Sequence, residues 1–351
     1  MTNADKIVYV DPCMFPWAQT YFLEGLEEVF GKKNIKFFSS FFRDLRYSYG
    51  KNFNFVISDG AKITKYSIDW FDVNDINDYE AYEWCDVYGK VNTNWSVLHT
   101  YTHGAKVVAI GPSFGIKKYN LFGSIKVWLL NSIKCKFSIK EMLQYARYYY
   151  REYNRLPLKT YVPNKNKVEN GYVFFLSTLW YDANWNNNDN DLNTPRYKMM
   201  KIAASNPLIH FEGGFVIHNK RNRSRGYESS THKYLDMIYP KRLSIREYHK
   251  KIYRSYVILN TPAVVGCHGW KLAEALAYGK AIVSIPLKNE LPHPLEHGKN
   301  IHFVENTEES INNALEYIYP EYRQKLERGA RQYWEKYCSP IACLKLMKII
   351  E

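Results

Sequence analysis

Short apolar runs alternate with amphipathic segments along the whole chain. Apolar runs of strand length lie at 6–10, 53–58, 106–111, 171–177, 256–261 and 280–286, with shorter ones from 35, at 208–214 and at 300–304. Between them, apolar side chains recur at helical spacing, as at Leu23, Leu26 and Phe30. Strands that alternate with helices favour parallel pairing, so the pattern predicts an α/β fold.

A polar stretch divides this pattern into two halves. The predicted helices are 20–30, 139–155, 195–204, 244–255, 270–279 and a tail that begins at Thr307. Residues 156–171 have the Pro, Asn and Lys content of a linker. Since 351 residues exceed one typical domain, we expect an acceptor domain at 1–160 and a donor domain at 161–335. A helical tail at 336–351 would be able to pack back on the first domain.

Positive charge is concentrated in one segment. The chain carries a formal net charge of +13. Residues 218–254 hold eleven Lys or Arg and three acidic residues, a local excess of 11 − 3 = +8. Such a patch attracts phosphate, on a nucleotide, a nucleic acid or an anionic bilayer, although a solvated basic loop and helix has the same composition.

The remaining composition indicates a cytosolic protein. The six cysteines form no C-x-x-C pair, which is typical of reduced thiols. The first residues lack the pattern of a signal peptide, and no apolar run is long enough to cross a bilayer. We therefore expect a cytoplasmic location, with peripheral association at the inner face of a membrane as an option. The aromatic share of 17% suits sugar sites and interfaces.

The most informative segment is a strand, a glycine-bearing loop and a helix at 257–279. Gly266 and Gly269 precede the expected helix, and Lys271 lies in its first turn. Free backbone N–H groups at a helix N-terminus bind a diphosphate. Glu274, one turn further, has the carboxylate that accepts hydrogen bonds from a ribose.

Residues 274–283 read Glu-Ala-Leu-Ala-Tyr-Gly-Lys-Ala-Ile-Val. This resembles the donor-site motif of glycosyltransferases with the GT-B fold, especially the large retaining group, and it also looks like exostosin-type transferases. The resemblance implies two Rossmann-like domains with parallel sheets facing a cleft, with Glu274 on the donor ribose. The family's first Glu, eight positions earlier, is replaced by Gly266, which leaves the donor sugar and the stereochemical outcome open.

Other residues of the second half extend the expected donor site. By the same resemblance, the loop after the first strand of this domain contacts the donor phosphates. The predicted donor-binding residues are Ser177, Thr178, Glu212, Gly213, Gly266, His268, Gly269, Trp270, Lys271, Leu272 and Glu274. Arg196, Lys198 and His293 are further candidates, with ordinary surface roles as the alternative. Asp182, Asn184 and Asn186 alternate as in a calcium loop but lack its Gly and terminal Glu, which favours a flexible lid.

The acceptor side is expected in the first domain, beyond the carboxyl ends of its strands. Asp11, Asp59 and 111–115 follow predicted strands. A general base must be a carboxylate or a histidine, and Asp11, Asp72 and His103 are the candidates. No Asp-x-Asp signature lies beside a strand, so we predict no metal and no cofactor beyond the nucleotide-sugar as co-substrate.

Together these features predict a metal-independent glycosyltransferase of surface polysaccharide biosynthesis, acting on a glycan or a lipid-linked acceptor. Two alternatives remain open. One is a nucleotide-sugar epimerase of the same fold, and the other is a non-enzymatic protein that binds an anionic surface or nucleic acid. Nucleic acid ranks low, because no zinc or helix-turn-helix signature is present.

Overall fold

The computed structural model describes residues 6–45, 51–99, 106–163, 167–180, 192–217 and 232–351. The chain forms two compact units, and each is described by itself. Unit 1 contains residues 1–161, 289–294 and 334–351, and unit 2 contains residues 162–288 and 295–333. The chain passes from unit 1 to unit 2 one residue after the boundary predicted at 160.

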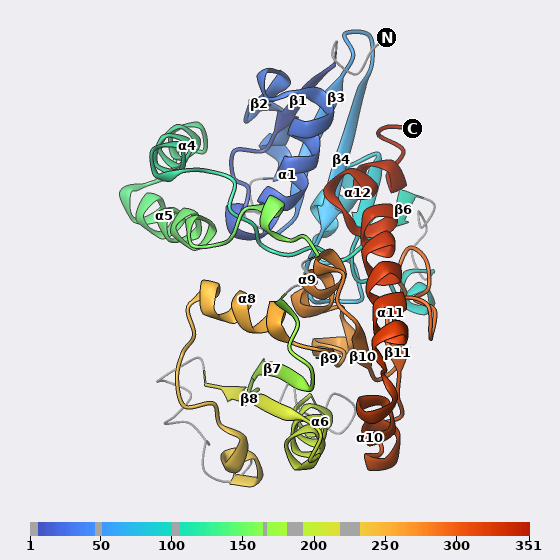
Figure 1. The fold of residues 1–351 in the computed structure, drawn as a ribbon. Helices are drawn as coiled ribbons and strands as arrows, with labels where there is room; N and C mark the ends of the chain where they lie inside the picture. Colours follow the sequence, from blue (N-terminus) through green and yellow to red (C-terminus); the bar gives the residue numbers. More distant parts are fainter. Residues whose placement is uncertain (1–5, 46–50, 100–105, 164–166, 181–191, 218–231) are drawn as a thin grey trace. The chain divides into compact units, whose positions relative to one another are not determined.

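Unit 1 contains a six-stranded sheet (Figure 1). Its order is β2 (Ile35–Phe37), β1 (Ile7–Val10), β3 (Phe53–Ser58), β4 (Ile63–Asp69), β5 (Val87–Lys90) and β6 (Val107–Ala109). Neighbouring strands are parallel except at β3, which is antiparallel to both β1 and β4. The prediction of purely parallel pairing is therefore wrong at β3, because Asp59-Gly60 closes a tight connection that pairs Ser58 with Ile63.

Helices cover this sheet and stack outward from it. They are α1 (Pro16–Phe30), α2 (Tyr79–Trp84), α3 (Trp95–Leu98), α4 (Leu121–Lys134), α5 (Ile139–Tyr153) and α12 (Pro340–Leu346). Pro16 opens α1 and Gly31, at φ 78°, ends it. Ser138 and Glu141 form a capping box at the start of α5. Helix α1 packs against α5, and α5 in turn packs against α4.

The C-terminal residues complete the core of unit 1. The hydroxyl of Tyr21 on α1 donates to the carbonyl of Cys338 at 2.7 Å, and Trp334 Nε1 donates to that hydroxyl at 3.1 Å. A Cβ at Gly25 would lie 2.9 Å from Pro340, and one at Gly111 would lie 2.3 Å from the carbonyl oxygen of Tyr337. These close approaches tie residues 334–351 to helix α1 and to the segment after β6.

Unit 2 contains parallel strands throughout its described part. The pairs β7 (Tyr172–Thr178) with β8 (His210–Val216), and β9 (Ile258–Asn260) with β10 (Ile282–Ser284) and β11 (His302–Phe303), are parallel. Parallel bridges join Val173 to Val257 and Phe215 to Ile238. The spatial order is therefore Ile238, β8, β7, β9, β10, β11, which is the 3-2-1-4-5-6 order of a Rossmann fold. The predicted α/β class with mainly parallel sheets is confirmed.

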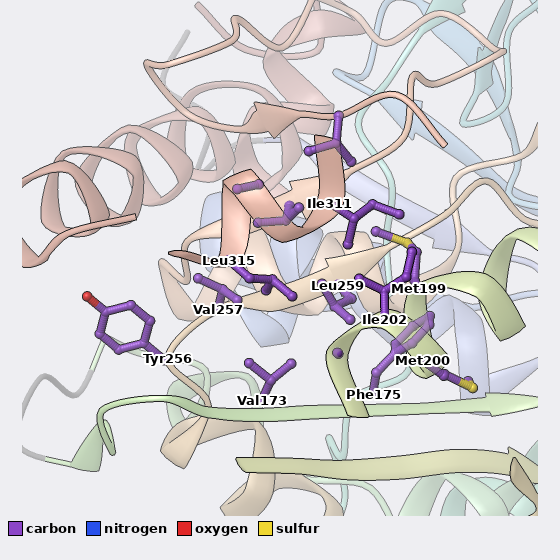
Figure 2. Close-up of a cluster of buried hydrophobic side chains, with 14 of the residues drawn as sticks. Val173, Phe175, Met199, Met200, Ile202, Tyr256, Val257, Leu259, Ile311 and Leu315 are labelled. Carbon is purple, nitrogen blue, oxygen red and sulfur yellow. The ribbon is translucent and has the colours of Figure 1, made fainter. Parts of the chain in front are cut away.

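The helices of unit 2 are α6 (Asn193–Ser205), α8 (Ile245–Arg254), α9 (Trp270–Tyr278), α10 (Glu308–Tyr317) and α11 (Pro320–Tyr333). Figure 2 shows the core, where Met199 and Ile202 of α6 and Ile311 of α10 meet strand residues such as Val173 and Leu259. Helix α6 begins at Asn193, two residues before the start predicted at 195. The Thr194 hydroxyl lies 2.9 Å from the hydroxyl of Tyr234.

All six cysteines are free thiols. Within the ranges given above, no helix combines the length and the apolar character needed to cross a membrane.

Candidate functional site

The order in which successive strands are added to the sheet of unit 2 reverses between β7 and β9. From β7 the chain moves to β8 on one side, whereas β9 begins the half that continues to β10 and β11. Ligands of open α/β sheets bind outside the carboxyl ends of the strands at such a switch point. Ser177 and Thr178 end β7 at this edge, and Asn260 ends β9. The fold thus favours a ligand beside the loop that follows β9.

That loop turns tightly before α9. The N–H of Ala263 donates to the carbonyl of Cys267 at 2.8 Å. Gly266 has a φ of 73°, and a Cβ at this position would lie 2.6 Å from the Cβ of Lys288. The left-handed backbone and the neighbouring lysine explain why glycine stands where the resembling family has glutamate.

The N-terminus of α9 is open. Its N-cap residue, Gly269, supplies no side-chain hydrogen bond, and its first turn contains no acidic residue. The nearest atom to a Cβ placed at Gly269 is the Cβ of Ala263 at 3.7 Å, so the backbone is not crowded there. No side chain caps the start of α9, and the positive end of the helix dipole favours an anion.

Arg196 of α6 brings a buried positive charge to the same loop. It is 5% exposed, and its Nε donates to Oγ1 of Thr261 at 3.3 Å. Its Nη1 has no hydrogen-bond partner among the described residues. Burial lowers the pKa of Arg196 to about 10, so the guanidinium remains charged at neutral pH. A buried guanidinium whose Nη1 lacks a hydrogen-bond partner among the described residues favours binding of an anionic ligand.

Lys271 lies close to Arg196 but points inward. Its amine donates to the carbonyl of Leu176 at 2.9 Å and sits 4.7 Å from the ring centroid of Phe175. Burial of the amine, together with the charge of Arg196, lowers the pKa of Lys271 well below its usual value, while Glu274 opposes this. The Lys271 amine is therefore held against β7 by residues of that strand.

The other residues of the predicted donor segment have different environments. Glu274 is buried and lines a cavity of about 10 Å³ with Lys271. The side chains of His268 and Leu272 are buried, and Trp270 is half-buried. The Leu272 N–H donates to the carbonyl of Gly269 at 3.0 Å, so this N–H group already has a partner within the first turn of α9.

A second cavity opens beside the loop. It measures about 70 Å³ and lies between the start of α6 and residues 261–266. Pro195, Thr261, Gly266 and Lys288 are among its lining residues. It adjoins the residue that precedes Arg196, which gives a ligand at the loop a protein-lined recess.

The structure corrects the prediction for Glu212 and Gly213. They were expected at the end of a strand, but β8 continues to Val216. Glu212 accepts hydrogen bonds from the hydroxyls of Tyr172 and Tyr239 and pairs with Lys251 at 2.6 Å. Gly213 is needed for packing, because a Cβ there would lie 2.1 Å from the carbonyl oxygen of Phe175. Both residues serve the sheet at a distance from its carboxyl edge.

Three further candidates are also placed elsewhere. Lys198 donates to the carbonyl of Asn306, away from the loop after β9. His293 belongs to unit 1, where it stacks on Tyr337 with ring centroids 4.9 Å apart. His103, the Asp182–Asn186 alternation and residues 218–231 of the basic segment lie outside the described residues. Within the described basic segment, Lys251 and Arg254 are paired with Glu212 and Glu169.

In unit 1, Asp11 lies directly after β1 at the carboxyl edge. Its carboxylate accepts the N–H of Cys13 at 2.9 Å and is 9% exposed. Burial raises the pKa of Asp11 to about 6, although the bonds from Cys13 and Asn54 oppose this. Asp72, in the loop after β4, is exposed.

Asp59 and residues 111–115 were also predicted at this edge, and the prediction is wrong for Asp59. Asp59 follows β3, and because β3 is antiparallel it lies at the opposite edge from Asp11. Its carboxylate accepts the N–H groups of Ala61 and Lys62 at 3.1 and 2.8 Å, which stabilises the turn. Residues 111–115 are buried, and Gly111 packs against the C-terminal segment.

A buried polar network, which the sequence analysis missed, lies beneath this edge. Lys90 and Asp69 end β5 and β4 and form an ion pair of 2.8 Å with both side chains fully buried. The hydroxyl of Tyr88 also donates to Asp69 at 3.0 Å. Asn52 extends the network by donating to Tyr88 and to Ser67. Neither strand is a continuous apolar run, so the pairing of their last residues gave no signal in the sequence.

Partly exposed aromatic rings surround the residues that follow β1 and β4. Phe15 lies 4.0 Å from Tyr148 and 5.9 Å from Trp70, and Trp17 lies 5.9 Å from Trp70, measured between ring centroids. The guanidinium of Arg155 lies 5.8 Å from the ring of Trp17. Such rings offer apolar faces with polar tips, which suit the faces of sugar rings.

In the described part of the chain, no three His, Cys, Asp or Glu side chains come together as potential metal ligands. The groups available for ligand binding in the described part of both units are therefore backbone N–H groups, cations, carboxylates and aromatic faces.

Neither the family models nor the curated proteins contain a match to this chain. Solved structures with a similar fold include glycosyltransferases and UDP-GlcNAc 2-epimerases. The C-terminal domain of a group 1 glycosyl transferase (LpcC) from Francisella tularensis is 12% identical, with 51% of this chain and 96% of that chain covered and a TM-score of 0.34.

Two further structures cover more of the chain. A variant of TarM from S. aureus in complex with fondaparinux, alpha-GlcNAc-glycerol and UDP is 10% identical, with 77% and 52% covered and a TM-score of 0.40. UDP-GlcNAc 2-epimerase from Neisseria meningitidis bound to UDP-GlcNAc is 13% identical, with 78% and 62% covered and a TM-score of 0.37. The chain thus spans less than two thirds of these two proteins. With every one of these TM-scores below 0.5, the similarities identify no family for this chain.

Proposed function

We propose that this protein is a glycosyltransferase of the GT-B type that binds a nucleotide-sugar at the carboxyl edge of unit 2. One observation carries the proposal. The buried guanidinium of Arg196, with Nη1 lacking a partner among the described residues, lies beside the uncapped N-terminus of α9. Both lie at the switch point of a Rossmann sheet, where nucleotides bind.

The diphosphate of the donor would occupy the anionic position. The N–H groups at Gly269 and Trp270 and the free nitrogen of Arg196 would donate to its oxygens. Lys271 adds a nearby amine. A bound anion would offset part of the repulsion from Arg196 and so raise the pKa of this amine. In this proposal Glu274 holds the ribose, and Ser177 and Thr178 contact the phosphates.

The same groups would stabilise the reaction. When an acceptor oxygen bonds to the anomeric carbon, the bond from that carbon to the diphosphate oxygen breaks, and its electron pair leaves with the diphosphate. Fixed donors and cations are most effective where such charge develops. In this proposal the donors and cations act without a metal ion.

We further propose that unit 1 binds the acceptor, a glycan or a lipid-linked sugar of a surface polysaccharide. Sugar rings would stack on the aromatic group of Phe15, Trp17, Trp70 and Tyr148. Asp11 is our choice of general base, since its raised pKa of about 6 lets it accept the proton of the acceptor hydroxyl near neutral pH. Such an enzyme would work in the cytoplasm at the inner membrane face.

The first experiment is a binding panel with the intact chain. Isothermal titration with UDP, GDP, ADP and the matching monophosphates should give binding of one diphosphate, with the monophosphate at least tenfold weaker. A panel without any binding overturns the proposal. Product analysis with the bound nucleotide's sugar conjugates alone separates the activities, because an isomerised donor without an acceptor would identify an epimerase instead.

A further inference from the structure

Helix α4 of unit 1 is built with its apolar face outward. Six large apolar residues of this helix are exposed, with Phe122 at 82% and Ile133 at 68%. The six are Leu121, Phe122, Ile125, Leu129, Leu130 and Ile133. The buried residues of the same helix are polar, namely Ser124, Asn131 and Ser132. This reverses the usual arrangement, in which the apolar stripe of a helix faces the core.

Hydrogen bonds hold the helix in this orientation. Asn131 Nδ2 donates to the hydroxyl of Tyr149 on α5 at 3.2 Å. Trp128 Nε1 donates to the carbonyl of Met142, also on α5, at 2.9 Å. Figure 1 shows α4 beside α5. Since both bonds fasten α4 to α5, they hold the apolar side chains of α4 in their exposed positions.

The start of α5 extends the apolar surface. Ile139 and Leu143, four residues apart, are 79% and 62% exposed. We call these two residues and the six on α4 the α4–α5 face. Eight neighbouring large apolar side chains form a patch far larger than the scattered apolar residues of ordinary surfaces, and such patches mark sites of association.

Positive charge predominates around the α4–α5 face. Residues 87–140 contain eight lysines and no acidic residue. Four of these lysines, Lys126, Lys134, Lys136 and Lys140, are exposed on α4, on the turn after it and on the first turn of α5. Glu141, the nearest acidic residue along the chain, is bound to Ser138 in the capping box. An apolar face with a basic rim is complementary to a bilayer with anionic headgroups.

We propose that the α4–α5 face docks unit 1 onto an anionic lipid bilayer. At 14 residues, α4 is too short to cross a membrane and would lie along its surface. The apolar side chains would enter the boundary between headgroups and acyl chains, and the lysines would contact lipid phosphates. This surface is distinct from the basic segment 218–254, and the inference does not depend on the proposed nucleotide-sugar chemistry.

Vesicle flotation with the full chain tests the proposal. Vesicles of phosphatidylcholine alone and of phosphatidylcholine mixed with phosphatidylglycerol are compared at low and high salt. We expect binding to the anionic vesicles that weakens as salt screens the lysines. Failure of the wild-type protein to bind anionic vesicles would overturn the proposal.

Variants then locate the surface. Phe122→Ser combined with Ile133→Ser should weaken partitioning by about tenfold for each lost side chain. Lys126→Gln combined with Lys140→Gln should weaken it by about fivefold for each lost charge and reduce the preference for anionic lipid. Leu208→Ser is the matched control, because Leu208 of unit 2 is 66% exposed outside the α4–α5 face; its partitioning should equal that of the wild type.

Two further measurements keep the result interpretable. Thermal unfolding should give equal midpoints for all four proteins, since the altered side chains are exposed. Light scattering reports the oligomeric state. If the wild type is a dimer that Phe122→Ser with Ile133→Ser converts to a monomer, or if that variant binds vesicles like the wild type, the α4–α5 face is not a membrane surface.

Discussion

Gly266 and Lys288 approach so closely that a Cβ on Gly266 would lie 2.6 Å from the Cβ of Lys288. The φ of Gly266, 73°, adds a second restriction, because side chains disfavour this region of the backbone. The loop after β9 is therefore shaped for glycine at the position where the resembling family has its first glutamate. The donor sugar must be recognised here without that carboxylate.

Replacing Gly266 should therefore destabilise unit 2. We expect Gly266→Ala to lower the free energy of unfolding by about 1–3 kcal/mol, from the left-handed backbone and the contact with Lys288. Gly269→Ala is the control, since its φ is −70° and its surroundings are open. It should stay within about 1 kcal/mol of the wild type in urea denaturation. Equal stability of the two variants would contradict the description of this loop.

The buried charge of Arg196 should not stabilise the free protein, but it should stabilise the complex with a diphosphate. Removal of a buried charge with an unsatisfied nitrogen should leave the free protein as stable as the wild type or more so. Arg196→Met should also weaken diphosphate binding by about 2–4 kcal/mol. Lys198→Met, on the same helix but directed to Asn306, should change neither quantity. Titration calorimetry and urea denaturation measure the two effects, and a large loss of stability without ligand would argue against an anion site.

Glu274 should act on the nucleoside part of the ligand. Glu274→Gln removes the negative charge and replaces one of the two carboxylate oxygens proposed to accept from ribose hydroxyl groups by an amide nitrogen, which only donates. We therefore expect mono- and diphosphates to bind more weakly by similar amounts, about 1–3 kcal/mol. Arg196→Met should instead act mainly on the diphosphate. The same titrations with the two variants compare these patterns, and unchanged affinity in a folded Glu274→Gln protein would remove the residue from the site.

The buried ion pair between Asp69 and Lys90 should be sensitive to loss of one partner. Lys90→Met leaves the Asp69 carboxylate buried without its cation, and we expect a loss of about 3–5 kcal/mol in the free energy of unfolding. The exposed pair of Lys201 and Asp236 offers a comparison, where Lys201→Met should cost at most about 1 kcal/mol. Denaturation curves that give similar losses for both variants would disprove the distinction.

The carboxyl group of Asp11 should make unit 1 less stable as the pH rises. Burial raises its pKa from 3.8 to about 6. Between these values the folded state binds the proton more tightly than the unfolded state, so the contribution of Asp11 becomes unfavourable by about 3 kcal/mol from pH 4 to pH 6 and then stays constant. Asp11→Asn should therefore gain stability relative to the wild type over this range. A difference that does not depend on pH would contradict the raised pKa.

The sequence predicted unit 2 in more detail than unit 1, for a physical reason. Strands of a parallel sheet are buried on both faces, so β7, β9 and β10 are continuous apolar runs with clear ends. The strand β4 alternates polar and apolar residues and was not predicted. Without β4, the reversal of β3 could not be predicted, and Asp59 was placed at the wrong edge.

For the candidate site, the backbone features were the predictable part. Glycine positions and a helix start follow from local pattern, so the loop after β9 and the start of α9 were found from the sequence. The burial of Arg196 depends on how α6 packs against Thr261, and the pairing of Asp69 with Lys90 depends on the neighbouring positions of β4 and β5. Contacts of this kind, between residues far apart in the chain, leave no signal in local spacing.

The contacts of residues 334–351 with α1 and with the segment after β6 also set an order of events during protein synthesis. Domains generally fold as units while the chain emerges from the ribosome. All residues of unit 2 lie within 162–333, so they are synthesised before Trp334 and Cys338, the partners of Tyr21. Most of unit 1 is synthesised before unit 2, but its core lacks these partners until residues 334–338 are made. Unit 1 therefore completes its core only after the whole of unit 2 has been synthesised.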